Sequence, residues 1–337
     1  MSESGIKGEL IAPPRCGLFR DEMRESFVAL EEFLQMRRRL SAFFGVGSPV
    51  ATLALFILLS CVPAVPRIVA VAGPQGPEEG IFRRQPWLLP SAQPGVLMRA
   101  TLFRPSGAGP FRLVVINHGT TQNAERRRML PMPSFETLSL WFVRHGFAVA
   151  VPERPGHGET GGLYREDQGG CDEADFARAG RGAAESIAAA LAYLRAQAFV
   201  RKAGAIAVGQ SAGGWAALAL ASRSPAGLRA AINFAGGLGG RSYDRPDNNC
   251  APDRLIAATA EFGRTTRIPT LWVYTENDSY FSPRLSAAMA AAFGAAGGKV
   301  DYELLPRFGE DGHYLAETEN TDAVWGPVVE RFLAALQ

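Results

Sequence analysis

The sequence predicts an α/β protein, in which a mostly parallel sheet is covered by helices on both faces. Short runs rich in β-branched residues alternate with longer helical patterns along the chain, and such alternation is typical of parallel sheets. The strand runs are nearly continuous in apolar residues, which indicates strands buried on both faces. The chain has 337 residues, 47% of them hydrophobic, so we expect one large core with an N-terminal appendage.

These patterns place seven strands and six helices. Strands are expected at Leu97–Phe103, Leu113–Asn117, Phe147–Val151, Ala205–Val208, Ala230–Phe234, Thr270–Tyr274 and Val300–Leu304. Helices are expected at Ser134–Arg144, Ala177–Ala198, Gly213–Arg223, Pro252–Phe262, Arg284–Ala296 and Ala323–Leu336. Because ligands of such sheets bind at the C-terminal ends of the strands, residues that directly follow a strand are the first candidates for a functional site.

The most informative stretch is Gly209-Gln210-Ser211-Ala212-Gly213, which fits the pattern Gly-x-Ser-x-Gly. A strand pattern precedes it and an apolar helix start follows it, which predicts a sharp turn that holds the Ser211 oxygen at the end of the sheet. The flanking glycines remove Cβ atoms that would clash in this turn. The helix N-terminus favours the negative charge that develops during acyl transfer. Ser211 is therefore the candidate nucleophile.

A serine hydroxyl needs a base and an orienting acid, and the sequence offers both downstream. Asp278 follows the strand expected at 270–274, and His313 lies on a Gly-flanked loop after the strand expected at 300–304. The order Ser, Asp, His separates this arrangement from the other triad folds. We therefore expect Asp278 and His313 to complete a catalytic triad, with Glu276 as the alternative acid.

An oxyanion hole is expected beside the serine. The turn Asn117-His118-Gly119-Thr120-Thr121 follows an early strand, where a second backbone donor is needed. The backbone N–H groups of Ala212 and Thr120 are the candidate donors, with Thr121 as the alternative.

The other three histidines are not expected to act as the catalytic base. We expect His118 to shape the oxyanion turn, His145 to be structural and His157 to lie near the rim of the site. None of the four histidines pairs with another His or Cys at metal-ligand spacing. No metal and no cofactor are therefore expected.

These motifs resemble those of the α/β-hydrolase family, and within it the dienelactone-hydrolase-like and peptidase-S9-like single-domain serine esterases. The resemblance covers roughly residues 81 to 337 and is carried by Asn117 to Gly119, Pro152 to Gly158, Gly209 to Gly214, Glu276 to Asp278 and Asp311 to His313. Dienelactone hydrolases proper use a cysteine nucleophile, whereas position 211 here is serine. This departure argues against a dienelactone substrate and for a general ester or related acyl substrate.

The resemblance implies a serine hydrolase that cleaves carboxylic esters of small molecules through an acyl-enzyme. Two alternatives stay open: a peptidase or amidase of the S9 type, and a non-catalytic binding protein on a hydrolase fold. The chain lacks room for the large extra domain of S9 peptidases, and the intact Ser, Asp and His argue against the second. The net charge of +2 predicts no nucleic-acid partner. The basic run Arg126-Arg127-Arg128 is either a solvated face or a clamp for a carboxylate-bearing substrate.

Two long loops are expected at the edge of the site. The loop that contains Gly161 to Asp172 is predicted to form a partial lid, because loops of this length are usually functional or disordered. The Gly-rich loop Ala235 to Cys250 faces the same edge. Cys171 and Cys250 lie in these two loops, so a disulfide between them is expected in an oxidising compartment, two unpaired thiols being the alternative. It would close a loop of about 80 residues and stabilise the fold by about 4 kcal/mol.

The N-terminal region carries an export pattern. Residues 40–66 contain no charged side chain and follow Arg37-Arg38-Arg39, so residues 36–72 are expected to be a signal peptide or membrane anchor. Residues 1–35 are an N-terminal extension, either an amphipathic helix or the result of a wrongly assigned start. Residues 73–337 are the expected catalytic domain. A buried apolar helix inside the enzyme is the alternative for the uncharged stretch.

The fate of the segment is open between three outcomes. Leu58-Leu59-Ser60-Cys61 resembles a bacterial lipobox, in which Cys61 is lipidated after cleavage, and Ala70-Val71-Ala72 before Gly73 is an alternative cleavage site. The third outcome is an uncleaved anchor. In each case the basic residues stay cytoplasmic and the catalytic domain is exported, so it is periplasmic, secreted or membrane-anchored.

Overall fold

The computed structural model describes residues 70–336, which belong to one compact unit. The predictions for residues 1–35, for Cys61 and for all but the last three residues of the segment 36–72 lie outside the described residues. Among the described helices, none has the length and apolar character needed to cross a membrane.

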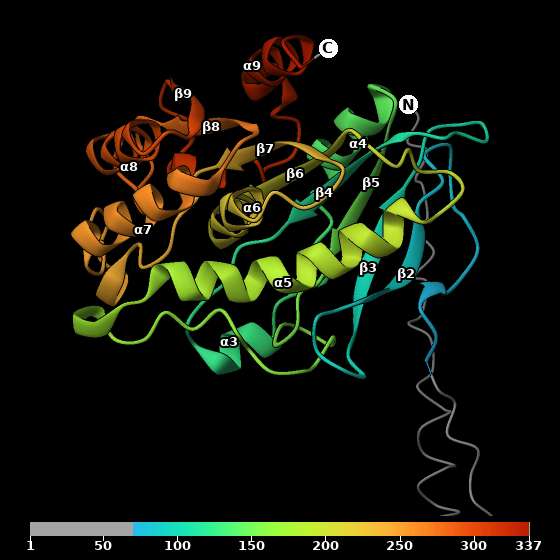
Figure 1. Ribbon diagram of the computed structural model, residues 1–337, viewed down its shortest axis with the longest axis horizontal. Helices are drawn as coiled ribbons and strands as arrows, with labels where there is room; N and C mark the ends of the chain where they lie inside the picture. The colour runs from blue at the N-terminus through green and yellow to red at the C-terminus, as the bar shows by residue number, and fades with distance from the viewer. Residues whose placement is uncertain (1–69, 337) are drawn as a thin grey trace, which may run out of the picture. The chain divides into compact units, whose positions relative to one another are not determined.

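One sheet runs through the middle of this unit (Figure 1). Its strand order is β1-β2-β3-β5-β4-β6-β7-β8-β9. The strands are β1 Gly73–Pro74, β2 Gln85–Pro90, β3 Leu97–Phe103, β4 Arg112–Asn117, β5 Phe147–Pro152, β6 Ala205–Gln210, β7 Leu228–Phe234, β8 Pro269–Thr275 and β9 Lys299–Leu305. The pairs β1–β2, β2–β3 and β3–β5 are antiparallel, and every neighbouring pair from β5 to β9 is parallel.

Helices cover both faces of the sheet and bury a separate apolar core on each. The helices are α3 Ala124–Arg128, α4 Glu136–Arg144, α5 Phe176–Arg195, α6 Ala212–Ser222, α7 Pro252–Thr265, α8 Pro283–Ala295 and α9 Asp322–Ala334. Three short 3₁₀ turns are η1 Cys171–Glu173, η2 Ser242–Asp244 and η3 Gly312–Tyr314. Helices α5 to α8 contribute to one core, around Trp215 and Trp272, and α4 and α9 contribute to the other, around Trp141 and Trp325.

All seven expected strands and all six expected helices are confirmed, with ends within about three residues of those expected. The sequence analysis missed β1, β2 and α3. Strand β2 contains Pro86 and Pro90, and proline argues against a strand because it cannot donate to the ladder. β2 nevertheless pairs with β3 along its whole length, from Gln85 opposite Leu102 to Pro90 opposite Leu97.

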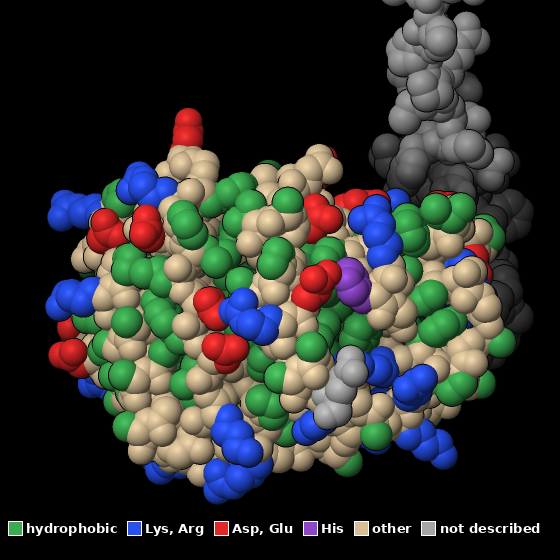
Figure 2. Space-filling model, turned by 90° about the horizontal axis from the view of Figure 1, so that it is seen from above, with side chains coloured by type: hydrophobic (Ala, Val, Ile, Leu, Met, Phe, Trp, Pro, Cys, Tyr) green, Lys and Arg blue, Asp and Glu red, His purple; other side chains and the backbone are tan. Residues whose placement is uncertain are grey.

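The parallel part of the sheet decides where a site can form. β4, β6, β7, β8 and β9 run in the same direction, so their C-terminal ends meet at one edge. The oxyanion turn, Ser211, Asp278 and the His313 loop each follow one of these ends. In the face drawn in Figure 2, acidic and basic side chains are interspersed among apolar and uncharged ones, which agrees with the small net charge of +2.

Candidate active site

Ser211 occupies a strained turn between β6 and α6. Its φ is 54° and its ψ is −126°, a conformation that costs an L-residue on the order of 1–3 kcal/mol. Its backbone is held by hydrogen bonds of 3.0 Å, from its N–H to the Phe234 carbonyl and from the Trp215 N–H to its own carbonyl. The Ser211 side chain makes no capping bond to α6. The turn therefore leaves the hydroxyl free for another partner.

The two glycines that flank Ser211 are required by close backbone approaches. A Cβ on Gly209 would lie 2.1 Å from the Gly213 carbonyl oxygen, and a Cβ on Gly213 would lie 1.9 Å from the Asn117 carbonyl oxygen. Real Cβ atoms are not found at such distances, so a side chain at either position would displace the backbone. The expected clash in a tight strand–turn–helix connection is confirmed.

His313 and Asp278 form a buried pair. The His313 Nδ1 lies 3.1 Å from Oδ1 and 3.3 Å from Oδ2 of Asp278, and the exposed fractions of the two side chains are 3% and 0%. The Asp278 Oδ1 also accepts the backbone N–H groups of Tyr280 and Phe281, each at 2.9 Å. Because an ionised carboxylate only accepts, the proton of the neutral imidazole is on Nδ1, and Nε2 is free to accept another. Glu276 is exposed, so the structure brings Asp278 and not Glu276 to the histidine.

The His313 ring and backbone are held from three sides. The Gln210 Nε2 donates to the His313 carbonyl at 3.0 Å, and the His313 N–H donates to Asp311 at 3.1 Å. The Tyr280 ring stacks on the imidazole with centroids 3.9 Å apart, and the Tyr280 hydroxyl lies 2.8 Å from that of Tyr314. These contacts fix the orientation of the imidazole, and the sequence analysis predicted none of them.

Ser211 and His313 line the same cavity, whose volume is about 510 Å³. The oxyanion turn, residues 118–121, forms one wall, and residues 130–135 form another. The second wall was missed, because its residues, Leu-Pro-Met-Pro-Ser-Phe, carry no chemical motif. The prolines at positions 131 and 133 restrict the backbone between α3 and α4, and from them an ordered connection could have been predicted.

The candidate oxyanion donors lie beside Ser211. A Cβ on Gly119 would be 3.8 Å from the Ser211 Oγ, so the turn after β4 packs against the nucleophile candidate. Thr120 and Thr121 both line the cavity. Ala212 is the first residue of α6, where the N–H groups have no partner within the helix.

His118 and His157 hold the oxyanion turn from behind. The His118 Nε2 accepts the Arg154 N–H at 3.0 Å, so its Nδ1 carries the proton and donates to the Gly119 carbonyl at 2.6 Å. Burial and the Arg154 guanidinium hold the pKa of His118 well below its usual value. The His157 Nε2 lies 2.6 Å from the Thr120 Oγ1, and burial lowers the pKa of His157 as well. The expectation that His118 shapes the turn is confirmed, and His157 has a defined contact to it.

A buried ion pair that the sequence analysis missed supports this arrangement. Arg154 is fully buried and donates to both Glu166 carboxylate oxygens, at 2.6 and 2.8 Å, and to the His118 carbonyl at 2.8 Å. Burial on its own would raise the pKa of Glu166, but the charge and hydrogen bonds of Arg154 outweigh it and hold that pKa below its usual value. Arg154 stands two residues after the end of β5 and directly before Pro155-Gly156, a pattern that does not distinguish it from a solvated turn residue.

The long loop after β5 is only in part a wall of the cavity. Glu153 and His157 at its start line the cavity, whereas residues 161–172, the predicted lid, do not. They are held against other parts of the domain. The Leu163 backbone exchanges two hydrogen bonds with the Gln93 side chain, and Glu166 forms an ion pair with Arg154. The loop is ordered by contacts with the body of the domain rather than by covering the cavity.

Arg127 fits neither reading of the basic run. It is buried, its guanidinium lies 3.5 Å from the centroid of the Tyr164 ring, and it donates to the Thr121 carbonyl at 2.8 Å. The contacts anchor the chain after the oxyanion turn. Neither a solvated face nor a carboxylate clamp describes this residue.

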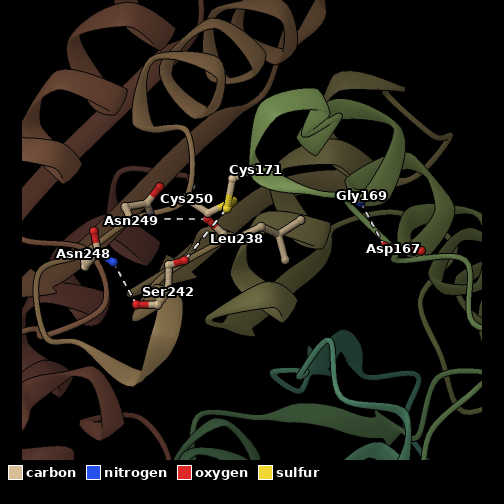
Figure 3. The surroundings of a disulfide bond; sticks show 8 residues. All are labelled: Asp167, Gly169, Cys171, Leu238, Ser242, Asn248, Asn249 and Cys250. Carbon is tan, nitrogen blue, oxygen red and sulfur yellow. Dashed lines mark hydrogen bonds between the residues drawn. A yellow bond between two sulfur atoms is a disulfide. The ribbon is translucent and has the colours of Figure 1, made fainter.

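Cys171 and Cys250 form a disulfide, as expected from their two loops (Figure 3). Their Cα atoms are 5.1 Å apart and 79 residues separate them in sequence. The loop around Cys250 is held by its own hydrogen bonds, from Asn249 to the Leu238 carbonyl at 3.3 Å and from Asn248 to the Ser242 carbonyl at 2.8 Å. The disulfide ties the loop after β5 to the loop after β7.

No cluster of three or more His, Cys, Asp or Glu with metal-ligand geometry is present among residues 70–336. The groups that the structure brings together at this edge of the sheet are the Ser211 hydroxyl, an imidazole oriented by a buried carboxylate, and backbone N–H groups around one cavity. These are the groups that acyl transfer to a serine requires.

Comparison with known proteins identifies the architecture. No known family profile matches the sequence, and no curated protein matches it. Among solved structures, acetyl xylan esterase 1 from Thermoanaerobacterium sp. JW/SL YS485 aligns with a TM-score of 0.53 at 15% identity, over 79% of this chain and 87% of its own. Dipeptidyl peptidase 4 of Porphyromonas gingivalis aligns with a TM-score of 0.54 at 15% identity, over 76% of this chain and 35% of its own. Acylaminoacyl peptidase of Pyrococcus horikoshii aligns with a TM-score of 0.52 at 12% identity, over 75% of this chain and 42% of its own.

The chain thus spans less than half the length of the two peptidases and most of the length of the esterase. At these identities the likeness is one of fold. With the strand order, the parallel sheet and the strand–serine–helix turn, it shows that the protein has the α/β-hydrolase fold.

Proposed function

We propose that the protein is a serine hydrolase that cleaves carboxylic esters of small molecules. The observation that carries this proposal is that Ser211, in a strained turn and with a side chain that makes no capping bond to α6, lines the same cavity as His313, whose Nδ1 is held by buried Asp278. Strain of this kind is retained where function requires it. A purely structural serine would gain nothing from the conformation.

In the proposed mechanism, the His313 Nε2 accepts the Ser211 proton as the Ser211 Oγ attacks the carbonyl carbon of the ester. Asp278 keeps the imidazole in the required tautomer and stabilises the imidazolium. The N–H groups of Ala212 and Thr120 bind the oxygen that becomes negative in the tetrahedral intermediate. His313 then protonates the leaving alcohol. A water molecule, deprotonated by His313, hydrolyses the acyl-enzyme and restores the Ser211 hydroxyl.

Labelling by a fluorophosphonate probe tests this proposal. The wild-type protein should be labelled, and Ser211→Ala should not be. Ser222→Ala, at the far end of α6, is the matched control and should be labelled as the wild type is. Labelling of Ser211→Ala at the wild-type rate, or none in the wild type, would support a non-catalytic binding protein instead.

A substrate panel separates an esterase from a peptidase or amidase. We expect turnover of p-nitrophenyl esters of increasing acyl chain length and little turnover of peptide anilides. The alignment covers 87% of acetyl xylan esterase 1 and less than half of each of the two peptidases, and this agrees with the expectation. Faster cleavage of the anilides would select the peptidase alternative.

We also propose that the catalytic domain is exported. The proposal rests on Arg37 to Arg39 and the uncharged residues 40–66, and the disulfide agrees with an oxidising compartment. Mass spectrometry of protein from its native host should find an N-terminus between Cys61 and Gly73. An acylated Cys61 selects a lipoprotein, and an intact Met1 in soluble cytoplasmic material would refute export.

A further inference from the structure

The cavity beside Ser211 is lined by two carboxylates and, within residues 70–336, by no Lys or Arg side chain. Glu153 and Glu317 are among its lining residues, and among the described residues neither Lys nor Arg is. Neither carboxylate has a Lys or Arg within ion-pair distance in residues 70–336. Because His118 and His157, which also line the cavity, have lowered pKa values, they add no compensating charge near neutral pH.

Glu317 is the more accessible of the two carboxylates. Glu153 is 1% exposed, and its Oε2 accepts the Thr160 N–H and hydroxyl, each at 2.9 Å. Glu317 lies four residues after His313, solvent reaches its side chain, and its carboxylate has no hydrogen-bond donor among the described residues. Although solvent reaches the side chain, the neighbouring protein atoms partly desolvate the carboxylate and raise the pKa of Glu317, and His313 acts in the opposite direction. A positive group in the cavity would supply the counter-charge that this carboxylate lacks.

Two tyrosines line the cavity together with Glu317, whose backbone N–H donates to the Tyr314 carbonyl. Tyr280 and Tyr314 both line it, and their hydroxyl groups are 2.8 Å apart. The ring faces of tyrosine attract cations. Because the Tyr280 ring is stacked on His313 and also lies 5.5 Å from the Arg241 guanidinium, Tyr314 is the ring left to attract an ammonium group beside the Glu317 carboxylate.

The basic residues near the cavity do not offset this charge pattern. Arg154 is buried and paired with Glu166, and Arg127 is stacked on Tyr164 behind the oxyanion turn. Arg241 lies 5.5 Å from the Tyr280 ring centroid and 3.8 Å from the Asp311 carboxylate, outside the cavity lining. A carboxylate-bearing substrate would meet two negative groups and no positive one.

We propose that Glu317 makes the cavity select esters that carry a positively charged ammonium group, and that the same residue disfavours esters that carry a carboxylate. This inference rests on the proposed esterase function, and it assigns a substrate class to the same site. Glu317 binds the charged end of the substrate, and Tyr280 and Tyr314 contact its methyl or methylene groups.

Three p-nitrophenyl esters of matched shape provide the test. They are the 4-(trimethylammonio)butanoate, the 5,5-dimethylhexanoate as its uncharged counterpart, and the hydrogen glutarate as the anionic one. The full-length protein should show kcat/KM values that fall in that order, the cationic ester exceeding the uncharged one by roughly five- to ten-fold, as expected of one partly exposed ion pair with an aromatic contact. Equal values for the cationic and uncharged esters would overturn the inference.

The variant Glu317→Gln should lower the ratio of cationic to uncharged kcat/KM by roughly three-fold or more, as loss of one ion pair predicts. The charge of Glu317 also acts on His313, the proposed base. An effect on this base changes kcat/KM for all three esters alike, because they share one leaving group. The ratio between two esters removes this common effect. Glu319→Gln is the matched control, since Glu319 is exposed on the same loop and does not line the cavity. Its ratio should equal that of the wild type. A ratio unchanged in Glu317→Gln would also overturn the inference.

Binding to an inactive variant separates this inference from the proposed function. Calorimetric titration of the three esters into Ser211→Ala should give the same order of affinity, and the order should be lost in Ser211→Ala/Glu317→Gln. If the wild type hydrolyses none of the esters but this binding order is found, the esterase proposal fails and the charge selectivity stands. If hydrolysis is found without any binding preference for the cationic ester, the selectivity fails and the esterase proposal stands.

Discussion

Breaking the buried ion pair between Arg154 and Glu166 is expected to damage both the stability of the domain and its turnover. Glu166→Gln keeps the size of the side chain but leaves the Arg154 guanidinium, which is 0% exposed, without its charged partner. The neighbouring His118 carbonyl, 2.8 Å from Arg154, cannot replace a carboxylate. The variant therefore carries a buried charge that is no longer balanced.

The size of this effect follows from the burial of both partners. Removing one member of a buried ion pair costs about 3–5 kcal/mol. For a domain of this size each kcal/mol lowers the melting midpoint by ~2–4 °C, so Glu166→Gln should melt roughly 6–20 °C below the wild type. Arg154 also holds the turn that carries Thr120. Loss of one oxyanion donor costs on the order of 10²–10³ in kcat, and a displaced donor should cost kcat at least ~10-fold, with KM little changed.

The matched control is Glu159→Gln in the same loop. Glu159 pairs with Arg99, but its side chain is 81% exposed, and exposed pairs contribute about 0–1 kcal/mol. Thermal melts followed by circular dichroism and ester kinetics on both variants decide the question. Melting midpoints of Glu166→Gln and Glu159→Gln that agree within error would refute the reasoning that the buried pair supports this edge of the sheet.

Three further outcomes are expected. Reduction of the Cys171–Cys250 disulfide should lower the free energy of unfolding by about 4 kcal/mol in urea titrations while probe labelling persists, and an unchanged midpoint would speak against the link. Because the pKa of buried His118 is depressed, the unfolded chain binds its proton first as the pH falls below ~6.5, so the stability that this residue contributes should fall from there toward lower pH; His118→Gln should flatten that slope, and an equal slope would contradict it. Asp278→Asn should reduce kcat strongly and Glu276→Gln little, and the reverse ranking would reassign the acid.

The sequence predicted the inner parallel strands well because they are buried on both faces. β5 and β6 are buried at every residue, so their apolar runs carry no competing signal. The antiparallel edge was harder to predict. In β2 the burial alternates and two of the six residues are proline. Its pairing with β3 overrides the low strand propensity of proline. A pattern read from neighbouring residues alone does not contain this pairing.

The site was predictable only where chemistry dictates both residue type and local backbone. Ser211 needs glycine neighbours, and Asp278 and His313 must follow strands, so their positions could be inferred from short motifs. Arg154 could not, because a charged residue in a turn is usually solvated, and only the tertiary structure brings Glu166 to it. The wall at residues 130–135 likewise depends on how the connection between α3 and α4 folds over the sheet.

The hydrogen bond from the Gln210 side-chain amide to the His313 carbonyl has a consequence for how Ser211 and His313 move relative to each other. Gln210 is the covalent neighbour of Ser211 and ends β6, so the nucleophile candidate and the base candidate share one anchor on the same strand. A displacement of the end of β6 therefore acts on Ser211 through the chain and on His313 through this hydrogen bond. Proton transfer depends steeply on the distance between Ser211 and His313. Because both residues are connected to Gln210, we expect this distance to change less than the position of either residue when the sheet moves.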